Sequence, residues 1–140
     1  MSATETYDVT ILSILQTAAI AAVAASGTPL LPIAGVDRIF TPPDDQKYLE
    51  LVWIPNNNGG DYWGDEKNYR GLFRLVLHWP KDDLGAYPPM NALASILSYF
   101  TKGNDLQNVQ IYEKPDIGST IVLDGERLYP ATIRYQCFRP

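Results

Sequence analysis

The stretch from Gly71 to Pro80 reads Gly-Leu-Phe-Arg-Leu-Val-Leu-His-Trp-Pro. Apolar side chains occupy every second position, which is typical of a β-strand with one buried face. We therefore predict a long strand over 69–79, with its phenylalanine, leucine and tryptophan side chains on one face. Arg70, Arg74 and His78 fall on the other face. This pattern indicates an antiparallel sheet with one buried and one partly wet face.

A second strand is predicted over 48–54, immediately before Pro55. Its leucine and tryptophan residues occupy every second position and alternate with Glu50 and other side chains, so this strand also has one apolar face. The segment 56–68 joins the two strands. It is too long for a tight hairpin turn and is predicted to be a polar loop.

Two helices are expected on either side of these strands in the sequence. The first should run over 6–26, where glycine and proline follow, with Ile20 and Val23 buried inside the subunit. Its many alanines would also allow close approach of a neighbouring chain. The second should begin at Pro88 and Pro89 and close at the Lys-Gly pair 102–103. Its apolar residues at helical spacing, expected to pack on the sheet, are Leu93, Ile96, Leu97 and Phe100.

The last third of the chain is predicted to be mainly strands. Short strands are expected over 109–112 and 119–123, and Asp124-Gly125 is a hairpin-turn pair that leads into a final strand over 127–138. The whole chain, residues 1–140, then forms one α+β domain. We predict a mostly antiparallel sheet of about five strands, with two helices packed on one face.

Composition excludes several classes of protein. Hydrophobic residues make up 46% of the 140 residues and charged residues 19%, which is not the composition of a disordered chain. The net charge of −5 argues against binding to a phosphate backbone. The apolar segment 9–25 is too short to span a membrane, and Glu5 and Asp8 stand where a signal peptide carries basic residues. A single cysteine, Cys137, excludes an internal disulfide.

The search for catalytic or metal-binding patterns finds none. His78 is the only histidine, and it is interpreted as a surface or interface residue. Cys137 lies in the alternation of the last strand and is interpreted as a small buried side chain. The acidic residues match neither a calcium loop nor a metal-binding helix, and no phosphate-binding glycine loop or nucleophile elbow is present. We predict no catalytic residue, no cofactor and no metal.

The loop 56–68 is the most unusual segment. It places Tyr62 and Trp63 between glycines and the acidic residues Asp61 and Asp65. Exposed aromatic rings favour contact with another protein, so this loop could be a contact arm that orders on binding. Alternatively, both rings fold back over the edge of the sheet. The sequence alone does not separate the two readings.

Several segments together resemble the tail terminator and minor tail proteins of long-tailed bacteriophages. The family pattern has an N-terminal helix, a Phe-x-Pro-Pro stretch, a strand that starts Tyr-Leu, a long strand from glycine to proline, a loop and helix, and closing strands. The matching segments here are Phe40–Pro43, Tyr48–Glu50, Gly71–Pro80, Gly85–Gly103 and Val109–Tyr135. The chain departs from the pattern at Glu50, where the family usually carries a basic residue, and in its acidic, aromatic loop.

The resemblance implies a virion structural protein of the tail-neck region, assembled in the host cytoplasm. It implies a ring, expected to be a homohexamer, that caps the tail tube protein, stops its polymerisation and presents a surface to the head connector. DNA would pass through the ring without specific binding. The suspected interface residues are Glu50, Asp61, Tyr62, Trp63, Asp65, Arg70 and Arg74.

Two other functions remain open at this point. A head-completion or connector ring would use the same kinds of subunit contact. A small ligand-binding or enzymatic domain would instead use the sheet face around His78, Arg74 and Arg70, but the sequence offers no second acid–base group of matching type.

Overall fold

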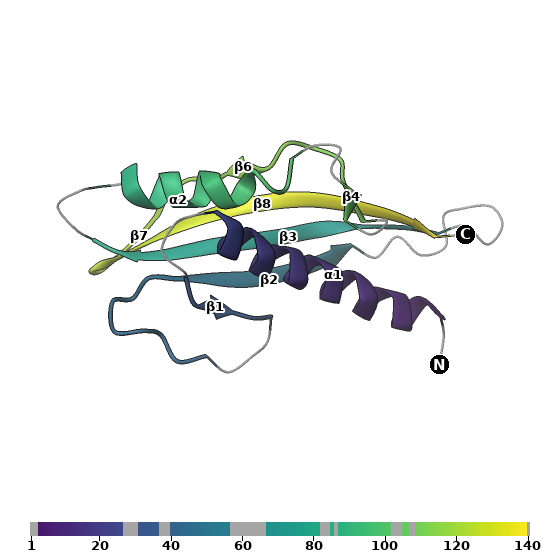
Figure 1. Ribbon diagram of the computed structural model, residues 1–140, viewed down its shortest axis with the longest axis horizontal. Helices are drawn as coiled ribbons and strands as arrows, with labels where there is room; N and C mark the ends of the chain where they lie inside the picture. Colours follow the sequence, from purple (N-terminus) through teal and green to yellow (C-terminus); the bar gives the residue numbers. More distant parts are fainter. Residues whose placement is uncertain are drawn as a thin grey trace.

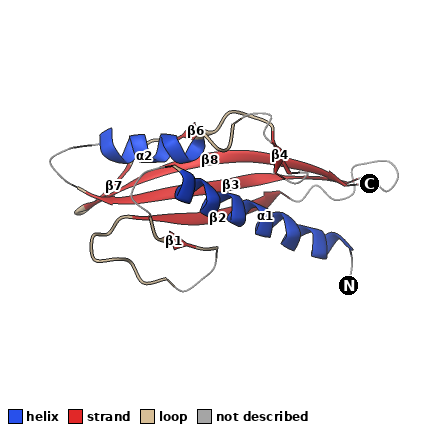
Figure 2. Cartoon of the chain, viewed as in Figure 1, coloured by secondary structure: helices blue, strands red, loops and turns tan. Residues whose placement is uncertain are grey.

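The computed structural model describes residues 3–26, 31–36, 40–56, 67–81, 85, 87–101, 105–106 and 109–139. Over these residues, two helices lie along one sheet, as Figure 1 and Figure 2 show. The sheet has eight strands in these segments. The predicted α+β class is confirmed, and the sheet is mostly antiparallel as predicted, with β1 as the parallel exception; the predicted number of about five strands is too small.

Three long strands form the centre of the sheet. They are β2 (Tyr48–Asn56), β3 (Lys67–Pro80) and β8 (Glu126–Arg139), and each is antiparallel to its neighbour in the order β2-β3-β8. Leu51 pairs with Leu75, which pairs with Ala131, so residues on one face of the three strands meet across the sheet. The predicted faces of the first two strands are confirmed. The core side chains on this face are Leu49, Leu51, Phe73, Leu75, Leu77, Trp79, Tyr129, Ala131, Ile133 and Tyr135.

Helix α1 (Ala3–Ala25) covers this buried face with one side of its surface. Its buried residues are Ile11, Leu15, Ala19, Ala22 and Val23, and their spacing of three, four and seven residues is that of one helix face. Val23 is buried as predicted. The prediction for Ile20 is wrong: that side chain is 55% exposed, because it lies on the other side of the helix.

Helix α2 (Tyr87–Leu97) lies on the same face of the sheet and buries Leu93 and Ile96. The helix ends earlier than predicted. Its backbone tightens into a turn, where the Phe100 N–H donates to the Leu97 carbonyl at 2.9 Å. Phe100 is nevertheless fully buried, so the apolar spacing correctly identified a core residue that lies beyond the helix.

The remaining strands are two or three residues long, too short to show a periodic pattern. β1 (Ile33–Ala34) pairs in parallel with the start of β2. On the far side of β8, β5 (Val109–Ile111), β6 (Asp116–Ile117) and β7 (Ile121–Leu123) pair one after another along its length. β4 (Asp105–Leu106) pairs with β5. The predicted Asp124-Gly125 hairpin turn is confirmed, with Gly125 at a φ of 72°.

Gly71 is required by a close approach inside the sheet. A Cβ atom at this position would lie 2.5 Å from the Tyr135 hydroxyl and 2.7 Å from the backbone oxygen of Ile54. The same Tyr135 hydroxyl accepts a hydrogen bond from the Trp53 indole N–H at 2.8 Å. A glycine at the start of the alternating stretch therefore lets one buried tyrosine tie β2 to β8 across β3.

Candidate interaction surface

The even-numbered side chains of β2, β3 and β8 lie on the sheet face away from the helices, which we call the open face. The register carries this face across the three strands, since Glu50 pairs with Val76 and Val76 with Pro130. Most of these side chains are partly exposed. The arginines lie toward one end of the face, with Arg74 near its middle, and His78 with Glu126 lies toward the other end, next to Glu50.

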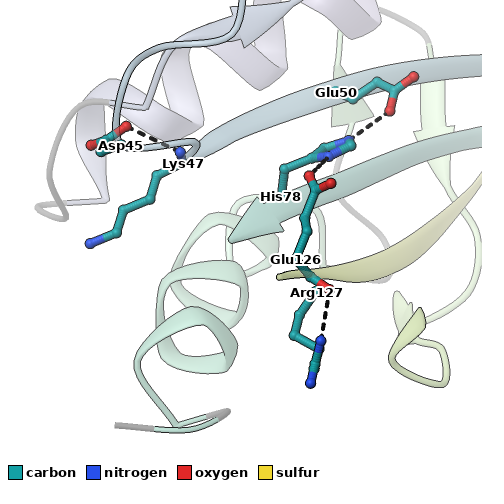
Figure 3. Close-up of polar contacts among 6 residues, drawn as sticks. All are labelled: Asp45, Lys47, Glu50, His78, Glu126 and Arg127. Carbon is teal, nitrogen blue, oxygen red and sulfur yellow. Dashed lines mark hydrogen bonds and ion pairs between the residues drawn. The ribbon is translucent and has the colours of Figure 1, made fainter. Parts of the chain in front are cut away.

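One end of the open face is organised around His78. Its Nε2 atom lies 2.8 Å from a carboxylate oxygen of Glu50 and its Nδ1 atom 2.7 Å from one of Glu126 (Figure 3). The three residues come from β2, β3 and β8, so the contacts join all three central strands. His78 is only 8% exposed, so the first part of its interpretation as a surface or interface residue is wrong for the single subunit, and the second part stays a prediction.

The geometry limits what His78 can do chemically. A carboxylate only accepts hydrogen bonds, and a neutral imidazole has a single N–H. Both contacts can be hydrogen bonds only when both ring nitrogens carry a proton. Glu50 and Glu126 contact both ring nitrogens of His78, and the arrangement is a clamp between the three central strands.

Tyr48 packs on this clamp. Its ring stacks on the His78 imidazole, with centroids 4.1 Å apart and the planes 10° apart, and the Phe40 ring packs against the Tyr48 ring with a centroid distance of 4.9 Å. Burial raises the pKa of the Tyr48 hydroxyl, and the charges of Glu126 and Glu50 raise it further. The tyrosine therefore stays neutral and serves as a packing surface.

The other end of the open face carries arginines. Arg70 is exposed and lies over the Tyr112 ring, 5.7 Å from its centroid. Arg134 contacts Asp116 at 2.6 Å and Glu113 at 3.7 Å. The hydrogen bond to Asp116 raises the pKa of Arg134, with smaller contributions from the nearby charges. Arg74 differs from both, because its buried Nε atom has no hydrogen-bond partner among the described residues.

The structure brings some of the suspected interface residues together and leaves others untested. Glu50, Arg70 and Arg74 share the open face as expected. Asp61, Tyr62, Trp63 and Asp65 lie outside the described residues, as does the side chain of Cys137. Sequence reasoning missed Glu126. The Asp124-Gly125 turn could have identified it, because a two-residue turn fixes the register that places Glu126 beside the end of β3.

No group of histidine, cysteine and acidic residues in the described segments is placed to hold a metal ion. None of the helices described has the length and hydrophobicity that a membrane span requires. The fold and its open face thus define a class: a small α+β protein whose charged side chains join the central strands on a partly exposed face of the sheet.

The comparisons with known proteins assign the family. The family model described as phage tail terminator protein matches residues 11–135, so the chain belongs to this family. One solved structure is 25% identical in sequence with a TM-score of 0.72, and the match covers 91% of this chain and 96% of that one. No curated protein matches the chain. The protein therefore has a structural role in a phage tail and is a component of the virion.

Proposed function

We propose that this protein forms a closed ring that caps the phage tail tube, ends polymerisation of the tube protein and presents its other surface to the head connector. Family membership supports this proposal. The observation that carries it is the inequality of the two edges of the sheet. One edge is β2, which β1 covers only in part, and the other carries the exposed hairpin strand β7.

Unequal edges suit a ring. Head-to-tail contact between two different patches closes into a ring when the rotation between subunits is a simple fraction of a turn, and otherwise continues as a filament. A tail tube needs a cap with one face that docks on the tube and one that no tube subunit can join. We propose six subunits, in line with the family resemblance. DNA would pass through without specific binding, consistent with the net charge of −5.

Two experiments test this function. Light scattering coupled to size exclusion, on the protein alone and mixed with tail tubes, should show a ring of six subunits. Deleting the gene should give overlong tails of variable length and filled heads without tails. A protein that stays monomeric with tubes present would refute the ring. Tails of normal length that fail to join heads would assign the protein to the connector instead.

A further inference from the structure

We propose that neighbouring copies of this chain join by strand addition, with the β7 edge of one copy pairing antiparallel along the free edge of β2 in the next, Val122 opposite Trp53. This proposal deepens the ring function above and rests on it. The proposal states which backbone N–H and carbonyl groups of the two copies form hydrogen bonds. Four independent features of the structure support the same pairing.

The first feature is the direction of the free backbone groups on β2. The Leu49 N–H points away from β3, since it donates to the Pro32 carbonyl at 2.9 Å. Backbone groups alternate along a strand, so those of Leu51 and Trp53 point the same way. β1 ends opposite Glu50, beside Leu51. Pro55, the next in the series, has no N–H. Trp53 is therefore the residue whose N–H and carbonyl are both available, and no strand in the described segments pairs with it on this side.

The second feature is the matching direction on β7. A two-residue turn at Asp124-Gly125 closes on the pair Leu123 and Glu126, which share hydrogen bonds in such hairpins. The next pair, Val122 and Arg127, then has its backbone groups directed outward. The N–H and carbonyl of Val122 thus face away from β8, as those of Trp53 face away from β3. These two residues can exchange both of their hydrogen bonds.

The third feature is the exposed apolar surface. In the described segments, seven large hydrophobic side chains are exposed, and four of them would lie in this joint: Ile54, Ile121, Val122 and Leu123. With Val122 opposite Trp53, Ile121 meets Ile54 and Leu123 meets Val52. Leu123 and Ile121 pair with Glu126 and Leu128 of β8, which places them on the open face with Ile54 and Val52. Aliphatic cross-strand pairs of this kind stabilise a sheet.

The fourth feature is geometric. β2 is antiparallel to β3, β3 to β8 and β8 to β7, so β7 of one copy runs antiparallel to β2 of a copy related by rotation. Ile121 pairs with Leu128, Leu128 with His78 and His78 with Tyr48, so Ile121 and Tyr48 lie at the same height in the sheet. Ile54 is six residues further along β2. Strands in closed barrels tilt by about 35–45°. Across four strands spaced ~4.8 Å apart, that tilt gives a stagger of roughly 13–19 Å, or about four to six residues.

Cysteine cross-linking tests the pairing. In a Cys137→Ser background, Ile54→Cys and Ile121→Cys in one chain should give a ladder of disulfide-linked multimers on oxidation, since directly opposed residues of a strand pair lie within disulfide range. Each single variant alone should give no ladder, and an equal mixture of the two should give linked dimers. Ile54→Cys with Tyr87→Cys is the matched control, because Tyr87 is 76% exposed on α2, away from both edges.

A second variant tests the backbone bonds. Val122→Pro removes the outward N–H, whereas Val122→Thr retains it. We expect the proline variant to keep its unfolding midpoint within a few degrees while its apparent subunit affinity falls at least tenfold. Rings by light scattering without a cross-linked ladder would refute the strand joint and leave the ring function intact. Absence of rings in the parent protein, with and without tubes, would refute both.

Discussion

The cluster around His78 and the arginines Arg70 and Arg74 lie on the same open face but differ in how fully their polar groups are paired. At the His78 end, the imidazole is 8% exposed and both of its nitrogens bind carboxylates of the same chain. At the arginine end, Arg70 is exposed and the Nε atom of Arg74 has no partner within the described residues. The difference shows that burial alone does not identify an interaction surface. What matters is whether the polar groups are already satisfied.

This contrast separates two roles on one face. Polar groups that are paired between β2, β3 and β8 stabilise the folded subunit, because removing one of them leaves its partners without a hydrogen bond. Removing a group that has unused hydrogen-bonding capacity should change the stability of the isolated subunit little and lower its affinity for partners more. We therefore expect substitutions at the His78 end to change the free energy of unfolding, and substitutions of Arg70 or Arg74 to change assembly.

The largest expected effect is at His78. His78→Ala removes both contacts of the imidazole and leaves Glu50 and Glu126 without their common partner, so the free energy of unfolding should fall by about 2 kcal/mol. Denaturant unfolding at pH 7 measures it. Arg134→Gln is the matched control. It breaks ion pairs with Asp116 and Glu113, whose side chains are 59% and 55% exposed, and should cost less than about 0.5 kcal/mol.

The same His78 variant separates structure from catalysis. We expect it to form rings and to support infection below its unfolding temperature. If Arg134→Gln destabilises as much as His78→Ala, the two ends do not differ as described. If His78→Ala folds and forms rings normally yet abolishes infectivity, an enzymatic role returns as an explanation.

The sequence predicted most of the fold because long strands and helices repeat their pattern many times. The faces of β2 and β3, the burial of Leu93 and Ile96, and the turn before Glu126 all follow from such local signals. Short strands were predicted over 109–112 and 119–123, and they are present as β5 and β7. β1, β4 and β6 had no comparable signal: two residues span one period, and these strands form because a neighbouring strand offers backbone partners.

The clamp at His78 could not be predicted from spacing, because its three residues are 28 and 48 positions apart in the chain. Their meeting depends on the register of two strand pairs. A histidine in a strand was therefore interpreted from its local alternation alone, which gave the correct face and the wrong burial. The three residues come together only after Glu50 and Glu126 have been aligned on either side of β3.

The next effect concerns Arg74 at the unsatisfied end. Arg74→Met retains a long apolar side chain and removes the guanidinium. The free energy of unfolding should therefore change by less than about 1 kcal/mol in either direction. We expect apparent affinity for the tail tube or for neighbouring subunits to fall about tenfold, or ~1.4 kcal/mol. Arg74→Lys keeps the charge and serves as the control. Unchanged assembly in Arg74→Met would remove this end from the interface.

A smaller loss of assembly is predicted for the aromatic loop. Replacing Tyr62 and Trp63 with serine should leave the unfolding midpoint nearly unchanged and weaken ring closure or tube capping several-fold, if both rings belong to a contact arm. Thermal unfolding and light scattering on the same samples measure the two quantities. A midpoint lowered by several degrees would mean that the rings pack on the subunit's own sheet.

The smallest effect appears only at high pH. Burial, with Glu126 and Glu50, raises the pKa of Tyr48 above its usual value near 10, so the folded protein retains this proton where the unfolded chain has lost it. The contribution of Tyr48 to the free energy of unfolding is therefore fully present below pH 10 and is lost as the pH rises through the folded pKa.

Tyr48→Phe keeps the ring that stacks on His78 and removes the titrating hydroxyl. Other tyrosines and the lysines titrate in both proteins, so the difference between the two stability curves isolates Tyr48. We expect the curves to run parallel from pH 6 to 9 and the wild-type curve to fall more steeply above pH 10. Parallel curves throughout would show that the Tyr48 hydroxyl is as well solvated in the folded chain as in the unfolded one, and that the His78 end is more open than its contacts indicate.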